Sequence, residues 1–392
     1  MMKRILLIAT LLIMMVGMNR PAPTQAQPMN MPLVMLISGD LWTWNPQTNA
    51  LVQLTTWGYN FKPVISPNGD WVAYKSWATI AVDGINRNGG FLNPGEPAGN
   101  IWLIDPLTAD ALRIAEQPAD ASFDNQNVPD KFVSRSNPVW SPDGTEVAWT
   151  EFRIPEFTSN LVIYNLASQT TRVINNNLPT GYEQYGPIDV AWGALGFVYQ
   201  IFSYNADIEN FVEEYYFYDV NGRNYNTVII PSGEFPQQDI FWFTGTDFIN
   251  SMENGIAIIN SGELPQLMNP QNSNVVNFMG LLVGYSAWQS LTQGNYVSFE
   301  SYVDTENYVY GINWMAQSSD GRFLGSIGTT FSYYDTMSKM AISPDGMSVA
   351  YIADDTSVLV WQGGRTVQLP VSNVEFIVWA PVLWTTNYPV GG

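Results

Sequence analysis

The sequence contains no cysteine and no histidine, and only 13% of its 392 residues are charged. Without cysteine, the chain has no disulfide, no thiol nucleophile and no cysteine-ligated zinc. Without histidine, it cannot build a Ser-His-Asp triad or a histidine-ligated metal centre. Basic residues are scarce, with 15 Lys and Arg against 35 Asp and Glu, and the formal net charge is −20. Because phosphate backbones require a Lys/Arg stripe, we exclude nucleic acid as a partner.

Apolar residues are abundant, since 46% of the chain is hydrophobic and 14% is aromatic. This composition is typical of a folded protein and not of a disordered one. The length suffices for one large all-β domain or two smaller domains.

The N-terminus has the three parts of a secretory signal peptide. Lys3 and Arg4 form a basic region, Ile5 to Met18 is an apolar run, and Ala26 ends a small-residue cleavage site. The run is shorter than the roughly 20 residues of a spanning helix, which disfavours the alternative of a membrane anchor. We therefore predict a signal peptide over 1–26 that is cleaved after Ala26.

Export follows from this prediction. Cleavage removes three basic residues and no acid, which takes the formal net charge from −20 to −23. We expect the mature domain, 27–392, to be secreted or held in the periplasm or cell envelope, with no membrane span after cleavage. A chain without cysteine suits an oxidising compartment.

An internal repeat runs through the rest of the chain. Three close copies begin at Pro63, Pro138 and Met340, and each has a strand, a Ser-Pro-Asx-Gly turn and a strand ending in Val-Ala-aromatic. Proline presets φ, Asx bonds to nearby backbone and glycine supplies positive φ, so each copy predicts a tight hairpin. Weaker copies begin near Val190, Ile240, Ala287 and Phe376.

A second half-repeat follows the first and predicts another hairpin. Its copies begin at Asn100, Asn160, Glu214 and Ser357. Two hairpins make a four-stranded unit, which is the blade of a β-propeller.

The Ser-Pro-Asp-Gly-x-x-Val-Ala-aromatic unit, followed by Ile-Trp-Leu-Ile-Asp, resembles the TolB-like, WD-repeat-like β-propeller family. The resemblance implies an all-β fold, a single propeller of four-stranded antiparallel blades. Predicted blade starts lie near Ile65, Trp140, Trp192, Trp242, Trp288, Ile342 and Trp379. These starts give seven blades, with six as an alternative and eight if Ser318–Gly321 marks a further start.

The last blade is incomplete at the C-terminus, and the N-terminus offers the missing strands. Leu33–Ile37, Asp40–Asn45 and Leu51–Leu54 are strand-like. We predict that they complete the blade begun by Phe376–Trp384. Such closure of the ring removes free sheet edges.

Two sets of residues have structural interpretations. Tryptophans recur at one place in the repeat and are predicted to be core between blades: Trp140, Trp192, Trp242 and Trp379. Acids in or beside the glycine turns are predicted to serve turn chemistry: Asp70, Asp143 and Asp345.

The connections of a propeller blade alternate between its two ends. The glycine turns, Pro106–Asp110 and Ala167–Gln169 are short and share one end. Long connections share the other end: Trp77–Gly99, Ala115–Asn137, Phe152–Ser159, Asn175–Gly186 and Ser203–Glu213. Insertions gathered on one face of a repeat ring indicate the binding face.

These long connections combine aromatic and acidic residues. The candidate binding residues are Trp77, Phe91, Asp120, Phe123, Asp124, Asp130, Phe157, Tyr182, Glu183, Tyr185, Tyr204 and Asp207. Aromatic faces stack on sugar rings or peptide side chains, and carboxylates accept hydroxyl or amine hydrogens. No cofactor is predicted, although clustered oxygens also suit Ca²⁺. The alternative that the aromatics pack the loops and the acids are solvated stays open.

The resemblance leaves function open, because propellers host many functions. Related peptidases carry a hydrolase domain with a triad, and related lyases rely on a histidine-ligated metal; this chain has no histidine. We therefore predict a non-catalytic binding or scaffold propeller for a protein, peptide or glycan. The alternatives are an envelope or surface-layer component, and a glycosidase or lyase using two carboxylates.

Overall fold

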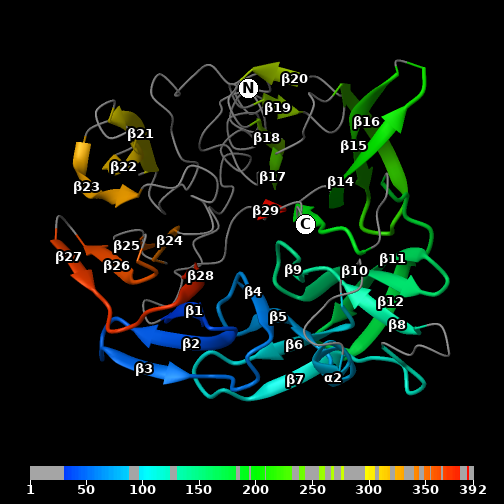
Figure 1. Cartoon of the computed structure of the whole chain (residues 1–392), viewed down its shortest axis with the longest axis horizontal. Helices are drawn as coiled ribbons and strands as arrows, with labels where there is room; N and C mark the ends of the chain where they lie inside the picture. The colour runs from blue at the N-terminus through cyan, green and yellow to red at the C-terminus, as the bar shows by residue number, and fades with distance from the viewer. Residues whose placement is uncertain are drawn as a thin grey trace, which may run out of the picture.

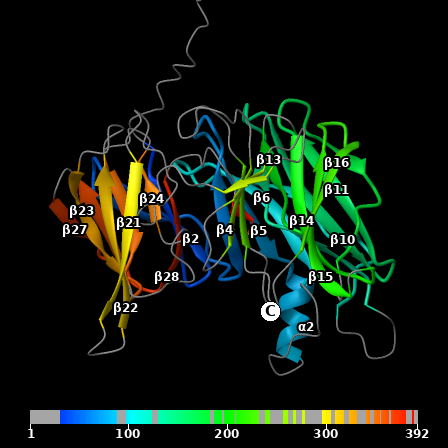
Figure 2. The ribbon, with the colours of Figure 1, turned by 90° about the horizontal axis from the view of Figure 1, so that it is seen from above.

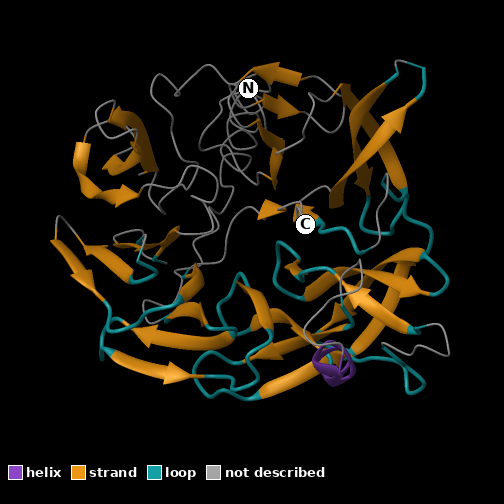
Figure 3. Cartoon of the chain, in the orientation of Figure 1, coloured by secondary structure: helices purple, strands orange, loops and turns teal. Residues whose placement is uncertain are grey.

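The structure is a computed structural model of the chain and is described for most residues between 31 and 387. The described residues are 31–87, 97–123, 130–181, 186–193, 196–207, 209–231, 238–242, 256–260, 266–268, 275–277, 296–304, 309–317, 323–330, 340–343, 348–353, 355–362, 365–379 and 386–387. The predicted signal peptide over 1–26 lies outside them. Strands dominate this part of the chain (Figure 3), and its one helix is α2 (Thr79–Arg87).

The described strands form seven antiparallel sheets. The first is β28 (Val374–Val378), β1 (Leu33–Ile37), β2 (Asp40–Asn45) and β3 (Ala50–Gln53), in spatial order. The second is β4 (Asn60–Ile65), β5 (Val72–Trp77), β6 (Gly99–Ile104) and β7 (Ala111–Ala115). In the third, β8 (Phe132–Arg135) and β9 (Val139–Trp140) both pair with β10 (Glu146–Ile154), followed by β11 (Thr158–Asn165) and β12 (Thr170–Asn175).

The remaining sheets follow in chain order. The fourth is β13 (Ala191–Gly193), β14 (Gly196–Asn205), β15 (Asn210–Tyr218) and β16 (Asn224–Pro231). The fifth holds β17 (Gln238–Trp242), β18 (Ile256–Asn260), β19 (Gln266–Met268), β20 (Val275–Asn277) and β29 (Thr386–Asn387). The sixth holds β21 (Tyr296–Asp304), β22 (Val309–Gln317) and β23 (Phe323–Thr330). The seventh is β24 (Met340–Ile342), β25 (Ser348–Ile352), β26 (Val358–Gln362) and β27 (Arg365–Gln368).

The sheets stand around a common centre, as blades of a propeller do (Figure 1). Their first strands are neighbours there: β28 contacts β24 and β4, β9 contacts β4 and β13, and β13 contacts β17. The last strands, such as β3, β7 and β12, lie at the periphery (Figure 1). The prediction is confirmed in its coarser form: the described residues are mostly β, and four of their seven antiparallel sheets are four-stranded.

One sheet joins the two ends of the described chain. β28 pairs antiparallel with β1, with Val34 opposite Val378 and Met35 opposite Ile377. The N-terminal strands therefore share a sheet with a C-terminal strand, as the sequence analysis expected. Because the sixth sheet shows three strands within the described residues, the count of seven blades and the closed ring stay predictions.

The serine turns explain why the repeat folds as it does. Gly69 and Gly144 adopt φ values of 79° and 72°, which an L side chain would strain. In each copy the serine Oγ accepts a hydrogen bond from the amide five residues later. These pairs are Ser66 with Trp71 at 3.0 Å, Ser141 with Glu146 at 2.9 Å, and Ser343 with Ser348 at 2.9 Å. The buried hydroxyl thus fixes the hairpin.

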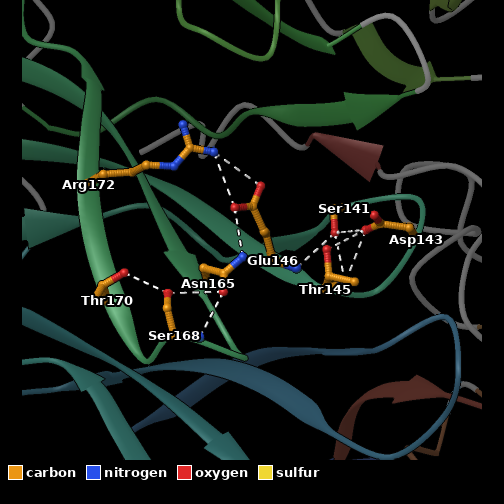
Figure 4. A network of polar contacts seen from close by, with 8 residues as sticks. All are labelled: Ser141, Asp143, Thr145, Glu146, Asn165, Ser168, Thr170 and Arg172. Atoms are coloured by element: carbon orange, nitrogen blue, oxygen red, sulfur yellow. Dashed lines mark hydrogen bonds and ion pairs between the residues drawn. The ribbon is translucent and has the colours of Figure 1, made fainter.

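Turn chemistry also accounts for the acids at this short-turn end (Figure 4). Asp143 accepts hydrogen bonds from the Ser141 hydroxyl at 2.6 Å and from the Thr145 hydroxyl at 2.9 Å. Asp70 accepts one from the Asn68 amide at 2.8 Å. The predicted role of both acids is confirmed, and Asp345 lies outside the described residues.

The repeated tryptophans lie in the core, as predicted. Trp140, Trp192 and Trp379 are 6%, 7% and 2% exposed. The Trp140 indole donates to the Val64 carbonyl of the preceding sheet at 3.0 Å, so the side chain bridges two sheets. The Trp242 side chain is not among those described.

The connections at the other end are more ordered than the sequence analysis expected. Trp77–Gly99 contains helix α2, which projects from this end (Figure 2). Its Ala81 packs with Ala78 against Phe132, and Ile80 lies partly buried against the same cluster. Strands also occupy parts of other predicted loops. β8 lies within Ala115–Asn137, β10 and β11 leave only a short turn of Phe152–Ser159, and β14 and β15 fill most of Ser203–Glu213.

Candidate functional site

Aromatic side chains gather at the end of the sheets that carries α2. Four of them form what we term the aromatic cluster: Trp57, Tyr59, Phe61 and Trp77. The first two lie in or beside the β3–β4 connection, Phe61 is in β4, and Trp77 ends β5. The cluster therefore spans the two innermost strands of the second sheet.

The four rings are in mutual contact. Tyr59 stacks on Trp77 with centroids 5.5 Å apart and planes 19° apart. The Phe61 ring centroid lies 5.3 Å from that of Trp77, and Trp57 meets Tyr59 edge-on at 5.6 Å. The Trp57 indole donates to the Trp77 carbonyl at 3.0 Å. Trp57 is 39% exposed, so the cluster reaches solvent through it.

One buried cation, Lys75, lies close to the Phe61 ring of the cluster. Lys75, on β5, is only 5% exposed, and its Nζ lies 5.4 Å from the centre of the Phe61 ring. A cation over a ring face is attracted by the ring quadrupole, more strongly when desolvated. Lys75 therefore supports the cluster from within and is shielded from solvent.

Asp40 holds the segment that carries Trp57. Its Oδ1 accepts hydrogen bonds from the Gly58 amide at 2.8 Å and the Thr55 hydroxyl at 3.1 Å. The Asn60 side-chain amide lies 3.4 Å from the same oxygen and donates to the Gly39 carbonyl at 2.8 Å. The β1–β2 turn of the first sheet thus fixes both ends of the connection to the second sheet.

Gly39 allows this close approach. Its φ is 75°, and a Cβ at this position would lie 2.2 Å from the Gly58 carbonyl oxygen. Any residue with a Cβ would displace the neighbouring backbone, so only glycine fits at this position. The position of Trp57 therefore depends on Gly39 as well as on Asp40.

Asp40→Ala is expected to lower the free energy of unfolding by about 1–3 kcal/mol, because a partly buried amide and a hydroxyl lose their acceptor. Trp57 should also become more accessible to the quencher acrylamide. Urea denaturation and fluorescence quenching measure the two effects. Asp219→Ala is the matched control. Asp219 lies at the short-turn end of the sheets and accepts hydrogen bonds from the backbone amides of Asn221 at 2.8 Å and Arg223 at 3.0 Å. An equal change in quenching in both variants would contradict the anchoring role.

Only part of the predicted binding set lies together. Trp77 belongs to the aromatic cluster. Phe157 and Tyr204 are 58% and 48% exposed at the β10–β11 and β14–β15 turns, on the same end as the cluster. Phe157 rests edge-on against Phe152 at 6.1 Å, and Tyr204 against Phe211 at 5.3 Å. Three neighbouring sheets thus each present an exposed aromatic here.

Other predicted residues serve local structure. Phe123 packs against Phe132 at 5.1 Å, beside α2. Asp120 forms an ion pair with Lys131, whose hydrogen bond holds the pKa of the Asp120 carboxyl below its usual value. The Asp207 backbone amide donates to the Asn205 side chain at 2.9 Å within a turn, and Asp130 adjoins Lys131. Phe91, Asp124, Tyr182, Glu183 and Tyr185 lie outside the described residues.

Sequence reasoning missed Trp57, Tyr59 and Phe61. Their spacing is the signal that was available, because aromatics at every second position fall on one face of an extended chain. Trp57-Gly-Tyr-Asn-Phe61 shows this alternation just before the first serine turn. This segment is not among the long connections from which the binding residues were predicted.

A set of hydrogen-bonded polar side chains around Glu214 lies in the fourth sheet. Glu214 accepts hydrogen bonds from the Tyr216 hydroxyl at 2.5 Å and from the Ser203 hydroxyl. Burial, and then the hydrogen bond with Glu214, raise the pKa of Tyr216 above its usual value. Both carboxylate oxygens are therefore engaged within the sheet.

The described residues contain no group of three or more Asp and Glu that could hold a metal ion, so they give the calcium alternative no ligand set. Within the same residues, no helix has both the length and the apolar character to cross a membrane.

Comparison with known proteins finds similarity of fold alone. No family model matches the chain, and no curated protein sequence matches it. TolB from Acinetobacter baumannii is 14% identical, with a TM-score of 0.38 over 89% of this chain and 66% of TolB. Oligogalacturonate lyase from Vibrio parahaemolyticus is 13% identical, with a TM-score of 0.46 over 85% of this chain and 92% of the lyase. The β-propeller domain of the Trilobed protease from Pyrococcus furiosus is 11% identical, with a TM-score of 0.38 over 85% of this chain and 87% of that domain.

Proposed function

We propose that the chain is an exported, non-catalytic β-propeller that binds a protein, peptide or glycan at the cell envelope or outside the cell. Seven blades form a ring, closed by the sheet of β28 and β1–β3. The N-terminal segment over 1–26 directs export. The binding face is the end of the sheets that carries α2 and the aromatic cluster.

One observation carries the proposal. Trp57, Phe157 and Tyr204 are 39%, 58% and 48% exposed and lie at the same end of three successive sheets. Large aromatic side chains exposed together mark interaction surfaces, because each buries a large area on binding at low entropic cost. At the short-turn end, polar side chains such as Asp143 are used in turns (Figure 4), and the exposed apolar side chains in the turns there include the aliphatic Leu107 and Val220.

The test compares capture of a partner by the purified chain and by a triple variant, Trp57→Ala with Phe157→Ala and Tyr204→Ala. Both are immobilised and exposed to the culture medium and envelope fraction of the source organism. We expect the triple variant to lose at least about tenfold in retained partner. The matched control changes three exposed side chains elsewhere, Leu107→Ala, Val220→Ala and Tyr225→Ala. Equal retention by the triple variant and the control would refute the assignment of this face.

A further inference from the structure

We propose that the aromatic cluster binds a neutral glycan and that Trp57 stacks on one of its sugar rings. This inference rests on the proposed binding function and names the ligand class. It is drawn from the fixed orientation of Trp57, the carboxylate beside it and the absence of an exposed cation among the cluster's described contacts.

The rings form a preorganised platform. The Trp57 indole is held by its hydrogen bond to the Trp77 carbonyl at 3.0 Å and by its edge contact with Tyr59 at 5.6 Å. Tyr59 and Trp77 are themselves stacked 5.5 Å apart. A rigid ring loses little conformational freedom when a ligand binds, so more of the contact energy becomes affinity. The flat CH face of a pyranose matches such a surface by shape and polarity.

A carboxylate stands next to Trp57 with acceptor capacity left. Asp40 Oδ1 holds the amide of the adjacent Gly58 at 2.8 Å. Asp40 Oδ2 accepts from the exposed Gln53 side chain at 3.4 Å, near the limit of a hydrogen bond. A carboxylate oxygen offers more than one lone pair, so Oδ2 can accept a sugar hydroxyl beside the stacked ring.

Charge favours a neutral ligand over an anionic one. The Asp40 carboxylate lies beside the platform, and the chain has a formal net charge of −20. Lys75 stands behind Phe61 and is 5% exposed, so it offers no surface charge to a sugar acid or a phosphate. An anionic ligand would meet repulsion from this carboxylate and from the net charge of the chain.

Hydrogen bonding favours a glycan over a proline-rich peptide. Proline-rich segments dock on aromatic grooves, and their carbonyls are acceptors that need donors on the protein. An indole has a single donor, and that of Trp57 is already given to the Trp77 carbonyl at 3.0 Å. Stacking on a sugar ring uses the ring face and leaves this bond intact.

The experiment measures binding of defined oligosaccharides to the purified chain by calorimetry and tryptophan fluorescence. The probes are the β-1,4-linked hexaoses of glucose and of N-acetylglucosamine, whose equatorial substituents leave flat apolar faces. We expect at least one to bind, with affinity lowered about tenfold or more by Trp57→Ala and by a smaller factor by Trp57→Phe. Tyr225→Ala, at an exposed aromatic of β16, should leave affinity unchanged.

Other outcomes overturn the proposal in distinguishable ways. If neither hexaose binds, or if binding is the same in Trp57→Ala, the glycan assignment is wrong. Trp57-dependent binding of a proline-rich decapeptide, or of a galacturonate hexaose, without binding of the neutral hexaoses would replace the ligand class while leaving the binding face intact. Failure of the immobilised wild-type chain to retain any partner would instead refute the binding function itself. Urea denaturation of each variant checks folding, and Trp57→Phe supplies the comparison if Trp57→Ala is unstable.

Discussion

Glu151→Ala is expected to lower the free energy of unfolding by about 3–5 kcal/mol, because it leaves a buried arginine without its partner. The Arg135 and Glu151 side chains are 5% and 6% exposed, and Nε of Arg135 donates to Oε1 of Glu151 at 2.9 Å. The Trp149 indole donates to the same oxygen at 3.2 Å, and Arg153 to Oε2 at 2.9 Å. Removal of the carboxylate takes this acceptor from the buried Nε of Arg135 and from the Trp149 indole, whereas Arg153 is 42% exposed and can be solvated.

The ion pair also joins two sheets. Arg135, on β8, donates to the Gly99 carbonyl at 2.6 Å and to the Glu116 carbonyl at 3.0 Å, both in or beside the second sheet. A variant that mobilises Arg135 therefore weakens the junction between the second and third sheets as well as the third sheet itself.

The stability lost in Glu151→Ala is expected to become smaller as the pH falls. Burial raises the pKa of the Glu151 carboxyl, but the charge of Arg135, the Trp149 indole and the charge of Arg153 lower it by more, so the pKa lies below its usual value. A depressed pKa stabilises the fold above the ordinary glutamate pKa, and this contribution is lost as pH falls through the folded-state value. Urea denaturation should show a large difference between wild type and Glu151→Ala at pH 7, and a smaller one at pH 3.

Two variants control this prediction. Glu146→Ala removes a more exposed pair, since the Glu146 and Arg172 side chains are 18% and 48% exposed, and should cost less than about 1 kcal/mol. Arg135→Met combined with Glu151→Met removes both charges and should recover much of the loss. Equal losses in Glu151→Ala and Glu146→Ala would show that burial of the pair does not determine its effect.

The hairpins were predictable because their information is local. A Ser-Pro-Asx-Gly segment encodes its own turn, and Gly69 and Gly144 adopt the positive φ that the turn needs. The pairing of β1 with β28 was predictable because the repeat ended on a single strand of its last blade. Trp140 and Trp379 were predictable as core because the repeat places them at the same position in each sheet.

The aromatic cluster was not predictable from the repeat, because it depends on a bulge. Phe61 is opposite Lys75, but Val64 is opposite Ala73, so β4 carries one extra residue between these pairs. In regular register Phe61 would be opposite Ser76, on the other face of the sheet. The bulge therefore turns Tyr59 and Phe61 to the face of Trp77. Likewise, the helix in Trp77–Gly99 was missed because a short amphipathic segment gives a weaker pattern than a strand repeat.

Trp379→Ala is expected to lower the free energy of unfolding by about 3–5 kcal/mol, as for other large buried aromatics. Trp379 is 2% exposed, meets Trp44 edge-on at 5.9 Å, and donates from its indole to the Met31 carbonyl at 3.0 Å. It packs in one apolar cluster with Ala350 and Val358 of the seventh sheet. The side chain thus ties the sheet of β28 and β1–β3 to its neighbour.

Comparison with Trp140→Ala makes this variant a test of the closed ring. Trp140 has the same place in the repeat, is 6% exposed, and donates to the Val64 carbonyl at 3.0 Å. In a closed ring every junction between sheets is internal, so both variants should lower the stability by similar amounts in a single cooperative transition. In an open ring Trp379 would lie at a terminal junction. Its variant would then release β1 and β28 locally, seen as fast hydrogen exchange of their amides, with a smaller loss of global stability.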